Sequence, residues 1–260
     1  MIWRLGVAGY PIEHSLSPRL HEVGLRLAGL EGSSERLALK RDQIAHLRAL
    51  LGTSFDALSV TMPLKSAAVA LCAQLDEVAA RTGVVNSLLV RDGVVHGACT
   101  DGRGFVDSLA GVFGANVKDM HAVVLGAGGA ARGIVDALVE GNVGSVFVYS
   151  RNQAKVEELA SHYASVYGSV QQPRRVDLIV NTVPVAGRVA EAAVMQGVTA
   201  DTLAIDITYE PRTSAWRELH DRAGCRSANG LAMLAYQAAL QMQWWWNVPI
   251  DASTLLGAIQ

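Results

Sequence analysis

Apolar residues in the first hundred positions alternate between short continuous runs and longer stretches in which they recur every three or four residues. The runs predict buried strands at residues 5–8, 36–40, 57–61, 84–90 and 94–98, the last two joined by a hairpin turn at Asp92-Gly93. The three-and-four spacing predicts amphipathic helices over residues 18–30 and 44–51. Ser17 and Pro18 suit the start of the first helix, with Ser17 as its N-cap.

From Gly102 onward, predicted strands and helices alternate regularly. We predict strands at residues 121–125, 145–149, 177–182 and 203–208. Helices are predicted at residues 105–113, from the glycine-rich segment at residues 126–132 through Val139, and at residues 154–163. Residues 231–246 predict a long C-terminal helix that packs back on the first half. This alternation is typical of an α/β fold with a doubly wound parallel sheet. We expect two domains around a cleft, with residues 1–101 and 231–260 in an N-terminal α/β domain and residues 102–230 in a Rossmann-type domain.

The composition narrows the class of protein. Of the 260 residues 50% are apolar, and the formal net charge of −2 comes without the basic face that a nucleic-acid binder needs. No apolar stretch reaches the length of a membrane-spanning helix, and the N-terminus enters a strand pattern without a leader. The three cysteines are far apart, as is typical of reduced thiols, and no metal-ligand set is complete. We expect a cytoplasmic monomer or homodimer that binds a small molecule, with no nucleic acid, membrane or metal.

A glycine-rich turn follows the predicted strand at residues 121–125. Gly126, Gly128 and Ala131 fit the pattern G-x-G-x-x-(G/A), in which the first glycine makes a tight turn and the second lets the backbone approach a pyrophosphate. The helix that begins there offers unpaired N–H groups and a positive dipole end to the phosphate. Small residues can also serve only to pack such a turn, but the strand before it and the apolar helix after it favour cofactor binding.

The end of the next strand distinguishes the two nicotinamide cofactors. An acidic residue there would accept hydrogen bonds from a ribose 2′-hydroxyl and favour NAD. This chain instead has Ser150, Arg151 and Asn152, with Lys155 one turn later. The planar guanidinium of Arg151 suits a 2′-phosphate, although a solvated arginine at a helix start is the alternative. We therefore expect NADP rather than NAD.

Polar residues of the first half stand where a packed loop would not need them. Ser15 and Ser17 are two residues apart, so both hydroxyls could face one carboxylate, although Ser17 could instead only cap its helix. Lys65 follows a buried strand and a proline, where a lysine partly removed from water suits acid–base work and a solvated lysine is the alternative. Asn86, on an apolar strand, is a buried amide that requires partners. Asp101 stands between the two halves, where it could also cap the next helix.

Six sequence blocks carry a resemblance that covers nearly the whole chain. They are GYPIEHSLSPRLH at residues 9–21, SVTMPLK at 59–65, VNSL at 85–88, TDG at 100–102, GAGGAA at 126–131 and NGLAMLAYQAA at 229–239. In this order they resemble the shikimate dehydrogenase family, which includes shikimate/quinate dehydrogenases. The first and last blocks are the most specific, whereas the glycine turn is shared by many dehydrogenases.

The resemblance implies roles for individual residues. Lys65 and Asp101 would be the catalytic pair at the ring hydroxyl that is oxidised. Ser15 and Ser17 would bind the substrate carboxylate, with Tyr209 near it, and the ring hydroxyls would be held by Thr61, Asn86 and Gln237. The residues that bind NADP would be Gly126, Gly128, Gly129, Ala130, Ala131, Ser150, Arg151, Asn152, Lys155, Thr182 and Gly230. Residues 1–101 with 231–260 would then form the substrate-binding domain, and residues 102–230 the NADP-binding domain.

The chain departs from the family pattern at a few positions. Cys99 stands where the family usually has Asn, so an amide near the substrate is lost. Ser59 and Ser150 each replace an Asn that is frequent in the family, but keep a hydrogen-bonding group. The glycine that follows the Asn-Thr-x-Pro motif at residues 181–184 is displaced to Gly187.

The expected activity is the reversible, NADPH-dependent reduction of 3-dehydroshikimate to shikimate in aromatic amino acid biosynthesis. One alternative is an NAD-dependent quinate/shikimate dehydrogenase, against which Arg151 argues. A second is a related enzyme that acts on a substituted shikimate, an alternative with which Cys99 in place of the usual Asn is consistent. A third, from another class, is a non-catalytic NADP-binding module, and the presence of both Lys65 and Asp101 argues against it.

Overall fold

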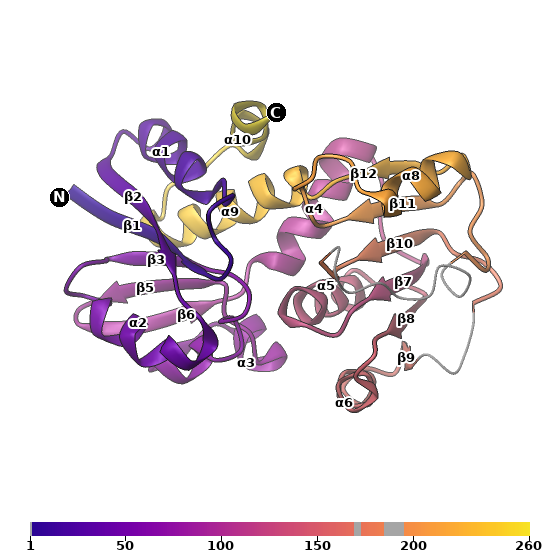
Figure 1. Cartoon of the computed structure of the whole chain (residues 1–260), viewed down its shortest axis with the longest axis horizontal. Helices are drawn as coiled ribbons and strands as arrows, with labels where there is room; N and C mark the ends of the chain where they lie inside the picture. Colours follow the sequence, from indigo (N-terminus) through magenta and orange to yellow (C-terminus); the bar gives the residue numbers. More distant parts are fainter. Residues whose placement is uncertain (1, 169–172, 185–194) are drawn as a thin grey trace. The chain divides into compact units, whose positions relative to one another are not determined.

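Two six-stranded sheets organise the described part of the chain, and each is the centre of one compact unit (Figure 1). The first unit comprises residues 1–105 and 233–260, and the second comprises residues 106–232. This computed structural model describes residues 2–168, 173–184 and 195–260, so the displaced Gly187 lies outside the described residues. Both units combine a sheet with helices on its faces, which confirms the predicted α/β class.

The sheet of the first unit is mixed. Its strand order is β2-β1-β3-β5-β6-β4, in which β1 is parallel to β2 and β3, whereas β5 is antiparallel to β3 and β6. In that order the strands are Glu31–Ala38, Ile2–Gly9, Ala57–Val60, Ser87–Arg91, Val94–Ala98 and Gln74–Leu75. The predicted hairpin joins β5 and β6, and both Asp92 and Gly93 adopt the positive φ that its turn requires.

Helices cover both faces of this sheet. They are α1 (Ser17–Leu27), α2 (Ile44–Leu50), α3 (Glu77–Thr82), the start of α4 (Asp101–Phe113), most of α9 (Leu231–Trp246) and α10 (Ala252–Ile259). Side chains of β3 alternate between the faces: Leu58 and Val60 join an apolar cluster with residues of α2 and α3, whereas Ser59 bonds to His21 of α1 and Gln241 of α9. α9 therefore packs on the same face of the sheet as α1.

Three local predictions in this unit are wrong. The second strand begins at Glu31 rather than at residue 36, because the polar edge strand β2 pairs with β1 along its whole length. Ser17 is the first helical residue of α1 rather than its N-cap, which is Leu16, and the N–H of Ser17 donates instead to Ser15 Oγ. Asn86 occupies the bend before β5 rather than a strand position. For β2 the backbone partners come from β1, which the apolar pattern of residues 31–40 does not show.

The sheet of the second unit is strictly parallel. Its strand order is β12-β11-β10-β7-β8-β9, made by Arg226–Ala228, Leu203–Asp206, Leu178–Asn181, His121–Leu125, Ser145–Tyr149 and Val166–Gly168. This is the doubly wound order in which β7 is the first strand and the strand order reverses between β7 and β10. In open sheets of this kind, ligands bind outside the carboxyl ends of the strands at that reversal. The predicted doubly wound sheet is therefore confirmed.

In its described residues the second unit has the remainder of α4, α5 (Gly129–Glu140), α6 (Gln153–Ser161) and α8 (Ala215–Arg222). Ile134 and Leu138 of α5 are fully buried, so the apolar helix predicted after the glycine turn is part of the core. On β7, Val123 and Leu125 belong to a cluster against which Trp216 of α8 packs. No helix in the described part of the chain is both long and apolar enough to cross a membrane.

Candidate active site

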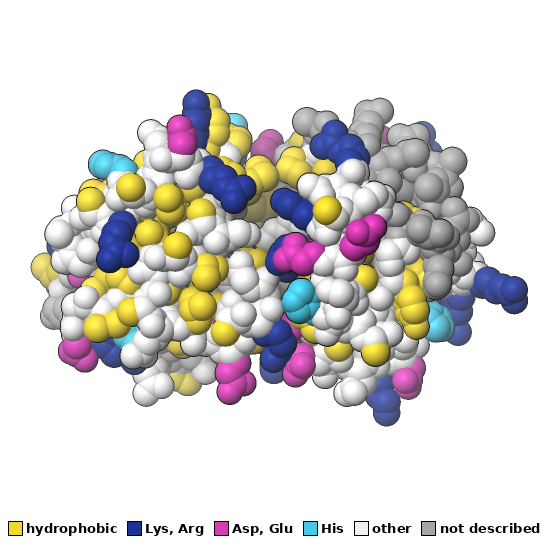
Figure 2. Space-filling view, turned by 90° about the horizontal axis from the view of Figure 1, so that it is seen from below, with side chains coloured by type: hydrophobic (Ala, Val, Ile, Leu, Met, Phe, Trp, Pro, Cys, Tyr) yellow, Lys and Arg dark blue, Asp and Glu magenta, His cyan; other side chains and the backbone are white. Residues whose placement is uncertain are grey.

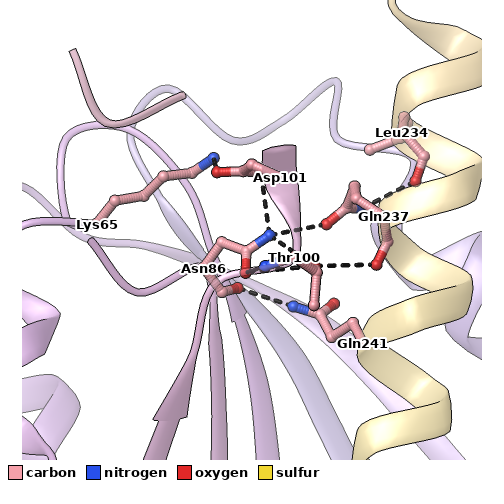
Figure 3. Close-up of polar contacts among 7 residues, drawn as sticks. All are labelled: Lys65, Asn86, Thr100, Asp101, Leu234, Gln237 and Gln241. Atoms are coloured by element: carbon pink, nitrogen blue, oxygen red, sulfur yellow. Dashed lines mark hydrogen bonds and ion pairs between the residues drawn. The ribbon is translucent and has the colours of Figure 1, made fainter. Parts of the chain in front are cut away.

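Two turns of the first unit bring a lysine and an aspartate together. The chain leaves β3 and turns through Pro63 to reach Lys65, and Asp101 is the first residue of α4, shortly after β6. Lys65 Nζ lies 2.6 Å from Asp101 Oδ2 (Figure 3). The sequence-predicted catalytic pair therefore forms an ion pair.

This ion pair is largely removed from water. The side chain of Asp101 is 4% exposed and that of Lys65 is 15% exposed. Buried charge is costly unless an opposite charge and further hydrogen bonds compensate it, so each member of the pair depends on the other. An ammonium group held in this way at a partly open position is suited to give a proton to a bound oxygen or to take one from it.

Asn86 holds the aspartate from a second direction. Its Nδ2 lies 3.0 Å from Asp101 Oδ1, 3.0 Å from Thr100 Oγ1 and 3.1 Å from Gln237 Oε1. Its Oδ1 accepts a hydrogen bond of 2.9 Å from the backbone N–H of Thr100. The buried amide thus finds the partners that its chemistry requires, and the carboxylate of Asp101 accepts from both Lys65 and Asn86.

Gln237 reaches the same cluster from α9. Its Nε2 donates to the carbonyl oxygen of Leu234 at 2.8 Å, which leaves Oε1 to accept from Asn86. Thr100 Oγ1 donates to the backbone oxygen of Gln237 at 3.1 Å. A Cβ on Gly104 would lie 2.5 Å from the backbone nitrogen of Gln237, so the glycine permits α4 and α9 to pack this closely. Four predicted site residues from distant parts of the sequence therefore converge.

Ser15 and Ser17 lie just before α1 and at its first residue, and both are buried. Ser15 Oγ accepts from the N–H of Ser17 at 3.3 Å, and the carbonyl oxygen of Ser15 accepts two hydrogen bonds from the Arg36 guanidinium, of 3.0 Å and 2.6 Å. Thr61 follows β3, where its N–H donates to Ala8 at 2.9 Å. Among the described residues no hydrogen bond joins these three side chains to the Lys65–Asp101 pair. Sequence reasoning did not identify Arg36, whose side chain holds the loop before α1 through the backbone carbonyl of Ser15.

Cys99, the main departure from the family pattern, is buried beside this cluster. Burial raises the pKa of its thiol to about 12, so the thiol is protonated at neutral pH. Its backbone N–H donates to Asp76 Oδ2 at 3.3 Å, and the other oxygen of Asp76 caps α3 through Ala79. A neutral thiol is a weak hydrogen-bond donor compared with an amide.

In the second unit the glycine turn follows β7, at the reversal of strand order. Gly126 has a φ of +111°, and a Cβ there would collide with Thr182 Oγ1. Thr182 itself donates to the carbonyl oxygen of Leu125 at 2.7 Å, which ties the ends of β7 and β10 together. Gly128 is the N-cap of α5, and a Cβ added to it would meet no atom of the described residues within 4 Å. The start of α5 therefore offers backbone N–H groups beside open space, as a pyrophosphate requires.

Gly129, Ala130 and Ala131 form the first turn of α5, and Ala131 is fully buried. Its small side chain therefore serves close packing of the helix. Gly230 lies just before α9, where its N–H donates to Thr208 at 3.0 Å and a Cβ would collide with the carbonyl oxygen of Ile207. Close backbone approach explains the glycine at this position.

Ser150, Arg151 and Asn152 lead from β8 into α6. Asn152 is the N-cap of α6, since its Oδ1 accepts from the N–H of Lys155 at 3.2 Å, and Ser150 Oγ accepts from the N–H of Asn152 at 3.3 Å. The side chains of Arg151 and Lys155 are exposed. Two cations thus stand at the start of α6, which suits a phosphate and not a free ribose hydroxyl.

Asp206, the last residue of β11, organises the loops beside it and was missed by sequence reasoning. It is buried and accepts hydrogen bonds from Asn181 Nδ2 at 3.1 Å, Thr208 Oγ1 at 2.8 Å and Ser214 Oγ at 2.6 Å. These bonds shape the turn that carries the half-buried Tyr209. The only available signal was an acidic residue that closes an apolar strand.

In the described part of the chain, neither the surface charge nor the clustering of possible metal ligands indicates a further site beside the Lys65–Asp101 cluster and the glycine turn. On the described part of the face drawn in Figure 2, basic side chains are scattered among acidic and other side chains. Within residues 2–168, 173–184 and 195–260, no three His, Cys, Asp or Glu side chains come together as a metal site.

Together, the parallel sheet with its glycine turn and the buried lysine–aspartate pair define a class of protein. The first is a Rossmann-type fold of the kind that binds dinucleotides, and the second is a buried ion pair whose chemistry suits acid–base work. This combination is typical of nicotinamide-dependent oxidoreductases.

Comparisons with known proteins identify the family. Residues 7–88 match the model of the shikimate dehydrogenase substrate binding domain, and residues 108–213 match the model named shikimate / quinate 5-dehydrogenase. The shikimate dehydrogenase (NADP(+)) of Exiguobacterium sp. is 35% identical over 253 residues, which cover 95% of this chain and 94% of that protein. The corresponding protein of Roseobacter denitrificans is 32% identical, with 93% and 91% covered. The chain belongs to the shikimate dehydrogenase family, as the six sequence blocks predict.

A solved structure agrees with this assignment. Shikimate 5-dehydrogenase from Thermus thermophilus, crystallised in complex with NADP(H) and shikimate, is 31% identical and superimposes with a TM-score of 0.86. The similarity covers 99% of this chain and 98% of that one.

Proposed function

We propose that this chain is an NADP-dependent shikimate dehydrogenase, an oxidoreductase that reversibly reduces 3-dehydroshikimate to shikimate in aromatic amino acid biosynthesis. The observation that carries the proposal is the 2.6 Å ion pair between Lys65 and Asp101, in a chain whose curated relatives are named shikimate dehydrogenase (NADP(+)). The hydrogen bonds of Asn86 to Asp101 and Gln237 add groups suited to a polyhydroxylated ring.

Lys65 would carry the acid–base step. NADPH, when bound, supplies a hydride to the carbonyl carbon of 3-dehydroshikimate. The ammonium group of Lys65 gives one proton to the carbonyl oxygen as that oxygen becomes a hydroxyl, and takes the proton back in the oxidation. Asp101 keeps Nζ in place, and its own second oxygen is held by Asn86.

The remaining substrate contacts follow from the family motifs. Ser15 and Ser17 would bind the substrate carboxylate, with Tyr209 near it, and Thr61, Asn86 and Gln237 would bind the ring hydroxyls. Ser17 is buried, yet its Oγ makes no hydrogen bond within the described part of the chain, which leaves it available to a ligand. Neutral hydroxyl donors suit a carboxylate that must also be released, because they add no fixed charge to retain the product.

NADP binding is assigned to the second unit. The open space in front of Gly128 and the start of α5 fits a pyrophosphate, and the exposed Arg151 and Lys155 fit a 2′-phosphate. The other residues assigned to the cofactor are Gly126, Gly129, Ala130, Ala131, Ser150, Asn152, Thr182 and Gly230. On this basis residues 1–101 with 231–260 form the substrate-binding domain and residues 102–230 the NADP-binding domain.

We also propose a cytoplasmic location and a monomeric or homodimeric state. Cys72, Cys99 and Cys225 are all free, which supports a reducing compartment. Light scattering at assay concentration distinguishes the monomer from the dimer.

The experiment that tests the proposal follows nicotinamide absorbance in four mixtures, with shikimate or quinate as substrate and NADP or NAD as cofactor. We expect rapid reduction of NADP in the mixture with shikimate, and in none of the other three mixtures. Faster reduction of NAD, or activity on quinate, would assign the chain to the NAD-dependent quinate/shikimate alternative. Tight binding of NADP without turnover in any mixture would overturn the proposal, and Cys99→Asn would then test whether the substrate has changed.

A further inference from the structure

A chain of hydrogen-bonded side chains extends from Asn86 away from the Lys65–Asp101 pair and takes no part in the proposed acid–base step. Gln241 of α9 is completely buried, and its Nε2 lies 2.8 Å from the carbonyl oxygen of Asn86 (Figure 3). Its Oε1 lies 2.5 Å from Ser59 Oγ, which in turn lies 2.9 Å from His21 Nε2. The other ring nitrogen of His21, Nδ1, lies 2.8 Å from Ser34 Oγ.

The chemistry of these groups, with His21 neutral, determines the direction of each hydrogen bond. The carbonyl oxygen of Asn86 can only accept, so the Gln241 amide must turn Nε2 toward it and Oε1 toward Ser59. The single hydroxyl proton of Ser59 is then donated to Gln241, and Ser59 Oγ can only accept from His21. His21 must therefore carry a proton on Nε2, and in the neutral ring, which burial favours, its bare Nδ1 accepts from Ser34. The chain of donors runs from Ser34 through His21, Ser59 and Gln241 to Asn86.

This directed chain ends on the residue that orients the catalytic aspartate. Asn86 lies in the bend before β5, where its backbone oxygen also accepts from the N–H of Val60 at 2.7 Å and its N–H donates to Ala98 at 3.0 Å. With the backbone held at these points, the side-chain amide of Asn86 is directed at Asp101. Removal of the Gln241 donor would leave the buried carbonyl of Asn86 with one partner fewer and the bend less restrained.

We propose that Gln241 is a positioning residue for the Lys65–Asp101 pair, because it fixes the Asn86 carbonyl and thereby the amide that orients Asp101. The proposal rests on the proposed function. Gln241 touches neither member of the pair, so it acts through Asn86 on the alignment of the proton donor and not on substrate affinity.

Two substitutions at this position separate positioning from packing. Gln241→Met keeps the approximate volume but removes both hydrogen bonds, and we expect kcat with shikimate and NADP to fall about 10-fold, with both KM values within about threefold, since small misalignments of catalytic groups cost rate. Gln241→Glu reproduces the amide only when protonated, with one donor for Asn86 and one acceptor for Ser59. When ionised, it presents an acceptor to the Asn86 carbonyl.

The pH profile is the decisive readout. We expect Gln241→Glu to approach wild-type kcat at the acid end of the profile and to lose kcat as the pH rises, a dependence absent from wild type and from Gln241→Met. The other titratable groups of the network, His21 on α1 and the Lys65–Asp101 pair beyond Asn86, are common to all three proteins. Met242→Leu is the matched control, since it changes a fully buried neighbour on α9 that is outside the network, and it should keep wild-type kcat.

Two results would overturn the proposal. One is a folded Gln241→Met variant, judged by circular dichroism and thermal unfolding, that keeps kcat within about twofold of wild type or changes only KM. The other needs no substitution in the network: long-range proton–nitrogen NMR spectra of wild-type protein that show His21 protonated on Nδ1 would reverse the donor chain. Failure of the proposed function is distinct, because wild type would then not turn over shikimate while the His21 tautomer could still be as assigned.

Discussion

At the scale of single residues, the side chains of the first unit differ in how much hydrogen-bonding capacity they have left. Asn86 uses both ends of its amide and both backbone groups within the protein. The ammonium group of Lys65 has three N–H donors, but within the described residues it is hydrogen-bonded to Asp101 alone. A residue with all groups engaged is suited to positioning, whereas Lys65 retains donors that a substrate oxygen can use.

The first prediction concerns Lys65. Lys65→Met should lower kcat for shikimate oxidation by about 10²–10⁴-fold, the usual contribution of a general acid or base, and should raise the KM for shikimate far less. Steady-state kinetics with NADP measures both constants. Lys118→Met, which removes an exposed lysine of the second unit, is the control and should behave as wild type. An unchanged kcat in a folded Lys65→Met variant would refute the acid–base role.

At the scale of elements, the start of α5 separates two reasons for a glycine. Gly126 has a φ of +111° and no room for a Cβ beside Thr182, whereas Gly128 has a φ of −85° and open space around the same position. Gly126→Ala should therefore strain the turn and lower the free energy of unfolding by at least about 1 kcal/mol. Gly128→Ala should leave that free energy within about 0.5 kcal/mol of wild type.

The same pair of variants tests the cofactor site. An added methyl at Gly128 would occupy the space that we assign to the pyrophosphate, so Gly128→Ala should raise the KM for NADP about 10-fold while the KM for shikimate stays unchanged. Urea unfolding and initial-rate kinetics give the two readouts. A Gly128→Ala variant with normal NADP affinity would exclude this position from the phosphate site.

The elements also differ in how far the sequence determines them. α9 begins and ends where its apolar run predicts, at Leu231 and Trp246, because its buried faces are encoded locally. β2 is different: its residues are mostly polar and exposed, and it is a strand because β1 supplies backbone partners along its whole length. Pairing of this kind leaves no periodic signal.

Residues of the candidate site likewise differ in whether the sequence alone identifies them. Lys65, Asp101 and Gln237 could be named from the sequence because they stand in motifs that resemble a family. Gln241 and Asp206 could not, because their roles depend on partners distant in the sequence, such as Ser59 for Gln241. A residue whose function is to hold another is recognisable only when both are in place.

At the scale of the whole molecule, buried histidines make the stability of the fold depend on pH. Burial lowers the pKa of His21 from 6.5 to about 3, an effect that its contact with Gln241 only partly opposes. Below pH 6.5 the unfolded chain therefore binds a proton at this residue that the folded chain does not bind. The unfolded state holds more protons in this window, so the free energy of unfolding falls as the pH falls.

This pH dependence of the free energy of unfolding can be tested by replacing His21. The contribution of His21 is complete above pH 6.5 and is lost as the pH falls toward about 3, at a slope of about 1.4 kcal/mol per pH unit. His21→Gln removes the titrating group but keeps an amide that can donate to Ser59. Its free energy of unfolding, measured by urea titration at several pH values between about 6 and 5, should therefore fall less steeply than that of wild type by this amount. His220, whose pKa burial also lowers, is present in both proteins and cancels from the comparison. Equal slopes would mean that His21 is protonated in the folded state, and the donor chain from Ser34 to Asn86 could not then run as assigned.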